Sequence, residues 1–286
     1  MFASLAIAAA IAANGPATME EWHAACDGKE GWSDPAPPVH IYGSVYNVGT
    51  CTITALLITS PKGHVLLDAA TTEAAPHIAA NIERLGFRLQ DVRLIGASHE
   101  HHDHVGGLAE MQRLTGGIVM AMPAAFNTLE TGVLDESDPQ SELHAPFPGT
   151  GVGIILFDGN PLRAGPNVLR AYATPGHAPG STTWSWRACE RQRCVTIVYA
   201  DSVTAVSADD YRFSEHGGYV AAFRNSLRII GSLKCDLLIT PHPGASNLIE
   251  RLDGKGPLIS EGQCKDYAAR GAAALDARLA REAEAK

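Results

Sequence analysis

The amino-acid sequence predicts a fold of the α/β or α+β class, in which helices cover the outer faces of β-sheets. Two observations lead to this prediction. Strand-like and helix-like runs alternate in both halves of the chain, which is typical of helices packed outside sheets. The chain also has 286 residues, of which 45% are hydrophobic, enough for one large domain or two fused halves.

The first half begins with a polar segment, residues 16–38, which ends in a proline cluster and which we expect to be irregular. Strand-like runs follow, and residues 61–63 form a turn sequence between two of them. The expected strands are residues 39–48, 52–59, 64–69 and 92–97. Apolar residues at helical spacing predict helices over 72–85 and 107–114, and the first of these stops at Gly86.

The second half repeats this alternation. The expected strands are residues 154–157, 168–173, 182–186, 195–200 and 236–240. An amphipathic helix is expected over 219–230, and a charged terminal helix over 263–285. Alternation alone leaves open whether the two halves form one domain or two.

The composition argues against two classes of protein. The formal net charge of −9 is unsuited to a nucleic-acid binder, because such proteins carry basic surfaces. No apolar run reaches the roughly 20 residues that a membrane-spanning helix needs, so we expect no membrane association of the mature chain.

The N-terminus resembles a secretory signal. Residues 1–13 are apolar and rich in alanine, and small residues follow them. No Lys or Arg precedes Lys29, so the basic start of such a signal is missing, and a plain hydrophobic helix or a misassigned start is the alternative. We expect a signal peptide over residues 1–15 and therefore an exported protein.

The six cysteines form an even set, which fits disulfides in an exported chain. Cys189 and Cys194 flank four residues between two strand-like runs, so they lie at a hairpin tip where a bridge is sterically natural. None of the six has the Cys-X-X-Cys spacing of a zinc–thiolate site. Buried free thiols are the alternative.

Four of the twelve histidines fall close together, at positions 99, 101, 102 and 104. Imidazole and the neighbouring Asp103 carboxylate are ligands that suit zinc. In an extended segment residues two apart point the same way, so His99 and His101 can share one metal, whereas a helix would place them about 200° apart. We therefore expect a loop here, with Asp103 and His104 facing a second metal where the next helix begins.

Two further histidines, His177 and His242, lie on turns rich in Pro and Gly, each after a strand-like run. A single histidine in such a setting is more often structural or solvated. Here, however, three strand ends carry ligand-type residues, and loops on a rigid sheet commonly build functional sites. We interpret the three segments as parts of one metal site.

The pattern His-X-His-X-Asp-His, followed by a Gly-His turn and a late strand-ending His, resembles the metallo-β-lactamase superfamily. The resemblance covers the chain from its first expected strand onward. It implies that residues 39–286 form a single domain with the α+β, four-layer αββα sandwich of that superfamily. Two departures from its zinc–thiol members indicate subclass B3: Asp103-His104 replaces an Asp-X pair, and Ala200-Asp201-Ser202 lies where those enzymes have a metal-binding Cys. The six cysteines also lie where B3 enzymes with three disulfides have theirs.

The resemblance implies two zinc ions as cofactors. The implied ligands are His99, His101 and His177 for the first ion, and Asp103, His104 and His242 for the second. A hydroxide held between the ions would attack the lactam carbonyl, and Asp103 would be catalytic because it orients that hydroxide. The implied function is a zinc-dependent β-lactamase of the periplasm that hydrolyses penicillins, cephalosporins and carbapenems and gives antibiotic resistance. We also expect a monomer.

The resemblance further implies that Ser202 and Thr204 bind the substrate carboxylate and that Gln140 lines the pocket. In addition to Cys189–Cys194, the expected disulfides are Cys26–Cys51 and Cys235–Cys264.

Several neighbouring residues are not expected to be ligands. Glu100 and His102 alternate with the ligands and should point away from the metals. Asp68 is expected to support the metal loop, and Ser98 lacks the Gly-X-Ser-X-Gly context of a serine nucleophile. The histidines treated as surface or packing residues are His23, His40, His64, His77, His144 and His216.

The alternative is another hydrolase of the superfamily, such as a glyoxalase-II-like thioesterase or an acyl-homoserine lactonase. Those enzymes bridge both metals with a carboxylate from the strand where Asp201 lies. The sequence leaves open whether Asp201 or Ser202 faces the metals, because a one-residue change of register swaps the face. Export and the expected disulfides favour the lactamase. A structural zinc module is disfavoured, because six N/O ligands leave positions open for water.

Overall fold

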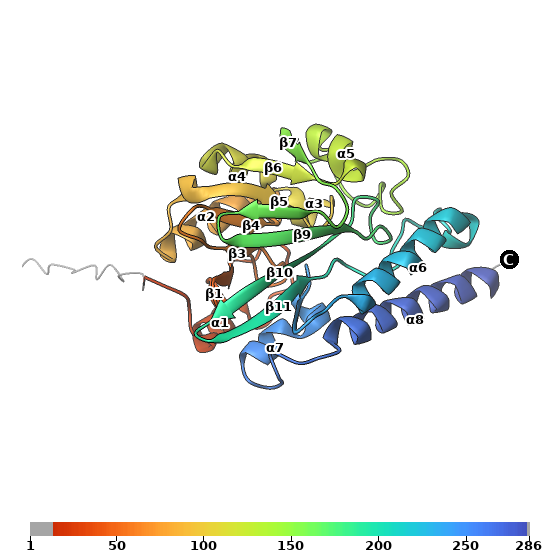
Figure 1. Cartoon of the computed structure of the whole chain (residues 1–286). Helices are drawn as coiled ribbons and strands as arrows, with labels where there is room; N and C mark the ends of the chain where they lie inside the picture. The colour runs from red at the N-terminus through yellow and green to blue at the C-terminus, as the bar shows by residue number, and fades with distance from the viewer. Residues whose placement is uncertain (1–13, 285–286) are drawn as a thin grey trace, which may run out of the picture.

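Two β-sheets lie face to face in the computed structural model, with helices on both outer sides (Figure 1). The structure describes residues 14–284, so residues 1–13, which make up most of the expected signal peptide, lie outside the described part. Among the helices described, none combines the length and the apolar character needed to cross a membrane.

The first sheet has seven strands in chain order. They are β1 Val39–Tyr42, β2 Val45–Asn47, β3 Leu56–Ile58, β4 His64–Leu67, β5 Val92–Gly96, β6 Ile118–Ala121 and β7 Val152–Ile155. The pairs from β1 to β4 are antiparallel and those from β4 to β7 are parallel. The carboxyl ends of β4, β5 and β6 therefore lie at one edge of the sheet.

The second sheet has five strands in the order β12-β11-β10-β9-β8. They are β8 Pro161–Ala164, β9 Asn167–Ala173, β10 Thr182–Glu190, β11 Arg193–Tyr199 and β12 Leu237–Ile239. Only the β11–β12 pair is parallel. As a result the turn from β9 to β10 and the carboxyl ends of β11 and β12 lie at the same edge of this sheet.

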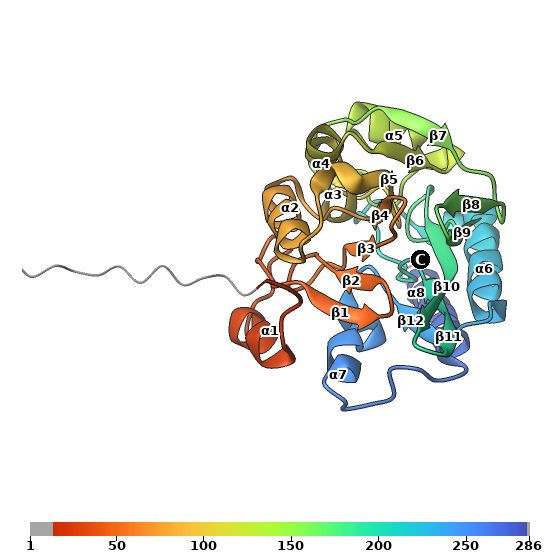
Figure 2. The same ribbon diagram turned by 60° about the vertical axis from the view of Figure 1, so that its left-hand side comes forward.

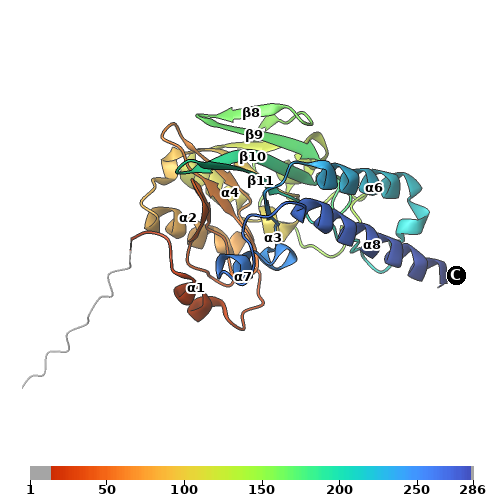
Figure 3. The same cartoon turned by 60° about the horizontal axis from the view of Figure 1, so that its bottom comes forward.

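Helices lie on the outer faces of both sheets and at one edge of the sandwich (Figures 2 and 3). They are α1 Met19–Cys26, α2 Ala75–Arg84, α3 His102–Val105, α4 Leu108–Thr115, α5 Phe126–Thr131, α6 Gly217–Ser232, α7 Leu248–Leu252 and α8 Gln263–Glu284. Helices α2 and α4 cover the first sheet, and α6 and α8 run side by side over the second. The predicted α+β class and four-layer αββα sandwich are confirmed.

Strands β3 and β4 are buried on both faces, and their side chains alternate between two cores. Leu57 and Leu66 pack in the core beneath α2, whereas Leu56 and Leu67 pack between the sheets in the core that contains Trp184. A strand buried on both faces has a continuous apolar sequence. This explains why the strand-like runs of the first half have so few polar residues.

Residues 16–38 are only partly irregular, so the expectation of an irregular segment was wrong for helix α1. Its first turn is closed by a capping box: the Thr18 side chain accepts the Glu21 N–H, and the Glu21 carboxylate accepts the Thr18 N–H. The helix then buries Trp22 and Cys26. The Thr-Met-Glu-Glu sequence has the spacing of this motif and could have indicated the helix.

The expected strand over residues 39–48 is two strands, β1 and β2, joined by a turn at Gly43. Gly43 has a φ of 58°, and a Cβ there would lie 2.7 Å from the carbonyl oxygen of Cys189. Only glycine fits both conditions, since other residues rarely adopt this φ. Four short elements, β6, α5, β8 and α7, were not predicted, because single strands or helical turns of this length show little periodicity.

The three expected disulfides are all present, joining Cys26 to Cys51, Cys189 to Cys194 and Cys235 to Cys264. They tie α1 to the loop after β2, close the β10–β11 hairpin, and tie the start of α8 to the segment before β12. No free cysteine is found in the described residues.

Candidate metal centre

The histidine cluster lies where strands of both sheets end at a common edge. Strand β5 ends at Gly96, the chain continues as a loop through His101, and helix α3 begins at His102. The predicted loop between the strand and the next helix is therefore confirmed. His177 lies in the β9–β10 turn, and His242 follows shortly after β12.

Asp68, at the end of β4, fixes the start of the histidine loop. Its Oδ1 accepts the backbone N–H of Ser98 at 2.6 Å, and its Oδ2 accepts the Ser98 hydroxyl at 2.7 Å and the Tyr199 hydroxyl at 2.6 Å. All three residues are fully buried. One carboxylate thus ties the ends of β4, β5 and β11 together, which is the supporting role expected of Asp68.

His99, His101 and His177 come together as a first group. Each offers a ring nitrogen, and these three nitrogens lie within 4.8 Å of one another. All three side chains are buried. Imidazoles converge at this distance when they surround one ion, so the arrangement fits the first zinc site predicted from the sequence.

In two of these rings a carboxylate contacts the outer nitrogen, which is the one that faces away from the other ligands. His99 Nδ1 lies 2.8 Å from Asp201 Oδ1, and His101 Nε2 lies 3.0 Å from Asp138 Oδ2. Histidines that bind zinc usually donate their second N–H to a carboxylate or another acceptor, which fixes the tautomer and the ring orientation. The inner nitrogens, His99 Nε2 and His101 Nδ1, are left for a metal.

A second group surrounds Asp103. Ligand atoms of His99, Asp103 and His104 lie within 4.8 Å of one another. Asp103 Oδ2 is 3.1 Å from His104 Nε2 and 3.4 Å from His242 Nε2. The side chain of His242 is 38% exposed, whereas that of His104 is fully buried. All six predicted ligands are therefore gathered at one edge of the sandwich, with His242 on its solvent side.

Unpartnered atoms test whether a metal fits. His99 Nε2 is buried without a hydrogen-bond partner among the described residues. The ring nitrogens of His104 make no hydrogen bond of good geometry either, although Nε2 faces the Asp103 carboxylate at 3.1 Å and Nδ1 faces that of Asp68 at 3.3 Å. An unpaired buried group costs about 1–3 kcal/mol, so His99 Nε2, which lies among the other ligand atoms, implies a missing partner. Neutral imidazole and carboxylate are ligands that zinc accepts. The residues fit a zinc-type metal.

The electrostatics of the first group favour neutral imidazoles. Burial, together with the neighbouring histidines, lowers the pKa of His99 and of His177 well below the usual value. A ring nitrogen must be deprotonated to bind a metal, so these shifts prepare both side chains as ligands. For His104, burial acts in the same direction, but the nearby Asp103 and Asp68 carboxylates raise its pKa instead.

Glu100 points away from the ligand groups, as expected from its position between His99 and His101. Its Oε1 accepts the Gly180 N–H at 2.6 Å, and burial raises its pKa to about 7. A Cβ on Gly180 would lie 2.6 Å from Glu100 Oε2. Glu100 thus ties the first histidine loop to the turn that carries His177.

The structure also shows how Asp201 lies relative to the ligand groups. The Asp201 carboxylate faces the outer side of His99 and belongs to neither ligand group. Burial raises its pKa well above the usual value. A carboxylate that bridges two metals would have to lie on the inner side of the ring. The bridging geometry of the thioesterase and lactonase alternative is therefore not seen at Asp201.

Two of the three residues expected to contact substrate, Thr204 and Gln140, lie close to the first group. Thr204 Oγ1 is 2.9 Å from His177 Nδ1, so this hydroxyl also orients a ligand. Gln140 is buried, with its Nε2 3.5 Å from both ring nitrogens of His177. Ser202 is 9% exposed and directly follows Asp201.

His144 is a site residue that the sequence did not indicate. Its ring stacks on that of His101 with centroids 4.4 Å apart, and it also stacks with Trp32 at 6.2 Å. A ligand atom of His144 lies within 4.8 Å of ligand atoms of His101 and Asp103. His144 is thus a packing residue, as expected, but it packs against a predicted ligand, and a lone histidine in a loop carries no pattern that would indicate this.

Comparisons with known proteins agree with this site. A model of the metallo-beta-lactamase superfamily matches residues 48–242, and the chain belongs to this superfamily. Its solved relatives assign the chain more narrowly to subclass B3. The metallo-β-lactamase MIM-1 from Novosphingobium pentaromativorans is 47% identical, with 92% of this chain and 98% of that chain covered and a TM-score of 0.90.

A second solved structure is the subclass B3 metallo-β-lactamase MEM-A1 from a soil metagenome library. It is 38% identical, with 90% of this chain and 100% of that chain covered and a TM-score of 0.86. Among curated proteins, the human mitochondrial persulfide dioxygenase ETHE1 is 28% identical over 160 residues, which are 56% of this chain and 48% of that protein. The chain thus spans about half the length of the curated relatives it matches, or less.

Proposed function

We propose that this protein is a zinc-dependent β-lactamase that hydrolyses the β-lactam amide of penicillins, cephalosporins and carbapenems. The observation that carries the proposal is the clustered set of six N/O ligands. Similarity to subclass B3 metallo-β-lactamases over most of the chain supports the substrate class.

The proposal includes two zinc ions per chain. The proposed ligands are His99, His101 and His177 for the first ion, and Asp103, His104 and His242 for the second. Zinc at such a site lowers the pKa of a bound water and polarises a carbonyl oxygen. Because His242 is the most exposed of the six, we expect the second ion to bind more weakly.

The residues of the chain have distinct roles in this proposal. Asp103 is the proposed catalytic residue: its carboxylate lies between His104 and His242, from where it can orient the attacking water. Ser202 and Thr204 would hydrogen-bond the substrate carboxylate, and Gln140 would line the pocket beside His177. Glu100, through Gly180, keeps the turn of His177 in position.

We propose that residues 1–15 are a signal peptide, that the mature protein acts as a monomer in the periplasm, and that it gives resistance to β-lactam antibiotics. Three disulfides support export, because such bonds persist in oxidising compartments.

Metal analysis combined with two variants tests the assignment of the site. Elemental analysis in zinc-containing buffer should return two zinc ions per chain, and one ion or fewer would contradict the dinuclear site. Asp103→Asn should lose far more turnover than Ser202→Ala, because the first change affects both a ligand and the orientation of the water. Equal losses would contradict the role of Asp103.

A further inference from the structure

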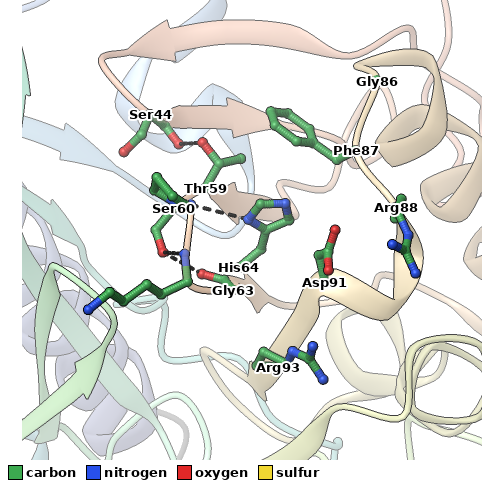
Figure 4. A pocket seen from close by; sticks show the side chains of 12 residues that line it. Ser44, Thr59, Ser60, Gly63, His64, Gly86, Phe87, Arg88, Asp91 and Arg93 are labelled. Atoms are coloured by element: carbon green, nitrogen blue, oxygen red, sulfur yellow. Dashed lines mark hydrogen bonds between the residues drawn. The ribbon is translucent and has the colours of Figure 1, made fainter.

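A second cavity lies at the far end of strands β4 and β5 from the metal centre (Figure 4). Its volume is about 660 Å³, and it lies between the β3–β4 turn and the segment that joins α2 to β5. Because β4 and β5 are parallel, their amino ends border this cavity while their carboxyl ends lead to the metal centre. The cavity is therefore separate from the candidate active site.

Three cationic side chains line the cavity: Lys62, Arg88 and Arg93. Among the described residues, the ion pairs of Lys and Arg involve other side chains, so these three have no carboxylate partner. Asp91 is the one acidic residue in the lining. In a chain with a net charge of −9, this local surplus of positive charge favours an anionic ligand.

His64 supplies a buried hydrogen-bond donor. The residue is 6% exposed, and its Nδ1 accepts the Ser60 backbone N–H at 3.1 Å, so the proton of the neutral ring lies on Nε2. Burial lowers the pKa of His64, which keeps the ring neutral. Figure 4 shows Nε2 turned toward the open centre of the cavity, and no described residue accepts its hydrogen.

The remaining lining divides into an apolar wall and satisfied polar groups. The ring of Phe87 meets that of His64 edge-on, with centroids 4.8 Å apart, and forms the apolar wall. The Thr59 hydroxyl already donates to the Ser44 carbonyl, and the Ser60 hydroxyl to the Gly63 carbonyl. Recognition is therefore left to His64, the cationic groups and Phe87, with the Ser44 hydroxyl as a further polar group in the lining.

We propose that this cavity binds a small organic carboxylate with a planar group. The carboxylate would accept hydrogen bonds from His64 Nε2 and the guanidinium groups of Arg88 and Arg93, and the planar group would lie on Phe87. Guanidinium groups match the two oxygens of a carboxylate. Asp91, on the same wall, disfavours a ligand of higher charge, so a monoanion fits better than phosphate, which carries about −1.5 to −2 at neutral pH.

Nuclear magnetic resonance of the zinc-loaded full chain tests this proposal, with benzoate, acetate and inorganic phosphate as probes. Protein labelled with ¹⁵N-histidine is titrated at constant ionic strength, with chloride as the balancing anion, so that electrostatic screening stays the same throughout the titration. Benzoate should shift the His64 ring signals in a saturable way, and acetate should bind at least about tenfold more weakly because it lacks the planar group. No saturable shift of His64, or equal responses to benzoate and chloride, would overturn the proposal.

Charge-reversal variants separate specific binding from a general effect of charge. Arg88 and Arg93 are exposed, so Arg88→Glu/Arg93→Glu should fold, and it should weaken benzoate binding by more than about tenfold. Arg187→Glu/Arg281→Glu makes the same charge change on exposed residues that do not line the cavity and should leave binding unchanged. If both double variants lost benzoate binding to the same extent, a site at Arg88 and Arg93 would be contradicted. Stronger binding of phosphate than of benzoate would reject the carboxylate class.

Discussion

The ring nitrogen Nδ1 of His99 lies 2.8 Å from Oδ1 of Asp201, and both side chains are buried. This contact turns His99 Nε2, which has no hydrogen-bond partner among the described residues, toward His101 and His177. It also assigns Asp201 to the outer side of the ligand. The same residue therefore orients a ligand and is prevented from bridging two metals.

Asp201→Asn should weaken zinc binding at the first site by about 10–100-fold, because the ring of His99 loses its carboxyl acceptor. Competition with a chromophoric chelator measures this affinity. Asp276→Asn, an exposed change on α8, is the matched control and should have no effect. Unchanged zinc affinity in Asp201→Asn would contradict the orienting role, and the complete loss of one ion would indicate direct ligation instead.

Glu100→Ala should destabilise the zinc-loaded protein by about 1–3 kcal/mol, because the buried Gly180 N–H loses its acceptor. Glu100→Gln should cost less, since the amide oxygen can accept the same hydrogen bond. Urea unfolding monitored by circular dichroism gives both values, with exposed Glu30→Ala as the control. If Glu100→Ala and Glu100→Gln lowered the stability equally, the hydrogen bond to Gly180 would not be the source of the stabilisation.

His23 should make the docking of α1 depend on pH. Hydrogen bonds to Asp27 and Asp253, at 2.8 and 2.6 Å, raise the pKa of His23. A raised pKa in the folded state gives stability that is fully present below the unfolded value of about 6.5 and is lost as the pH rises through the folded value. His23→Gln should therefore lower the melting temperature at acidic pH and have little effect at alkaline pH.

A mutant cycle checks this assignment. In an Asp27→Asn/Asp253→Asn background, the pH-dependent effect of His23→Gln on the melting temperature should vanish, because the charged partners are gone. If His23→Gln lowered the melting temperature equally at all pH values, its effect would come from packing.

Loss of the Cys235–Cys264 bridge should cost more stability than loss of Cys189–Cys194. The two bridges join residues 29 and 5 positions apart, and loop-closure entropy gives roughly 3–4 kcal/mol for the first and roughly 2 kcal/mol for the second. Paired Cys→Ser variants in denaturant titrations measure both values. The reverse order would indicate that the bridges act through native-state contacts rather than through the unfolded chain.

The parts of the fold and site that could be predicted from the sequence have strong local patterns. The clustered ligands between His99 and His104 identify their chemistry by residue type and spacing. Strands such as β10 and β11 are rich enough in Thr, Val, Trp and Tyr to be recognised without their neighbours. His177 and His242 follow from the same logic, since each lies just after a strand.

What the sequence did not predict depends on contacts between distant segments. His144 acquires its place only by stacking with His101 and Trp32, and nothing in its own segment indicates this. The face of Asp201 depends on the register of its strand, which a single sequence leaves open. The cavity at His64 forms between two turns that are far apart in sequence and so leaves no local signal.

Hydrolysis of β-lactams by the purified protein, before and after zinc removal, is the decisive measurement for the proposed function. We expect penicillin, cephalosporin and carbapenem substrates all to be cleaved, a chelator to abolish the activity, and added zinc to restore it. A serine-directed inactivator should have no effect, because no serine nucleophile is proposed. A zinc-loaded protein that cleaves S-lactoylglutathione or acyl-homoserine lactones but leaves all three β-lactam classes intact would contradict the lactamase assignment, while the metal centre itself would stand.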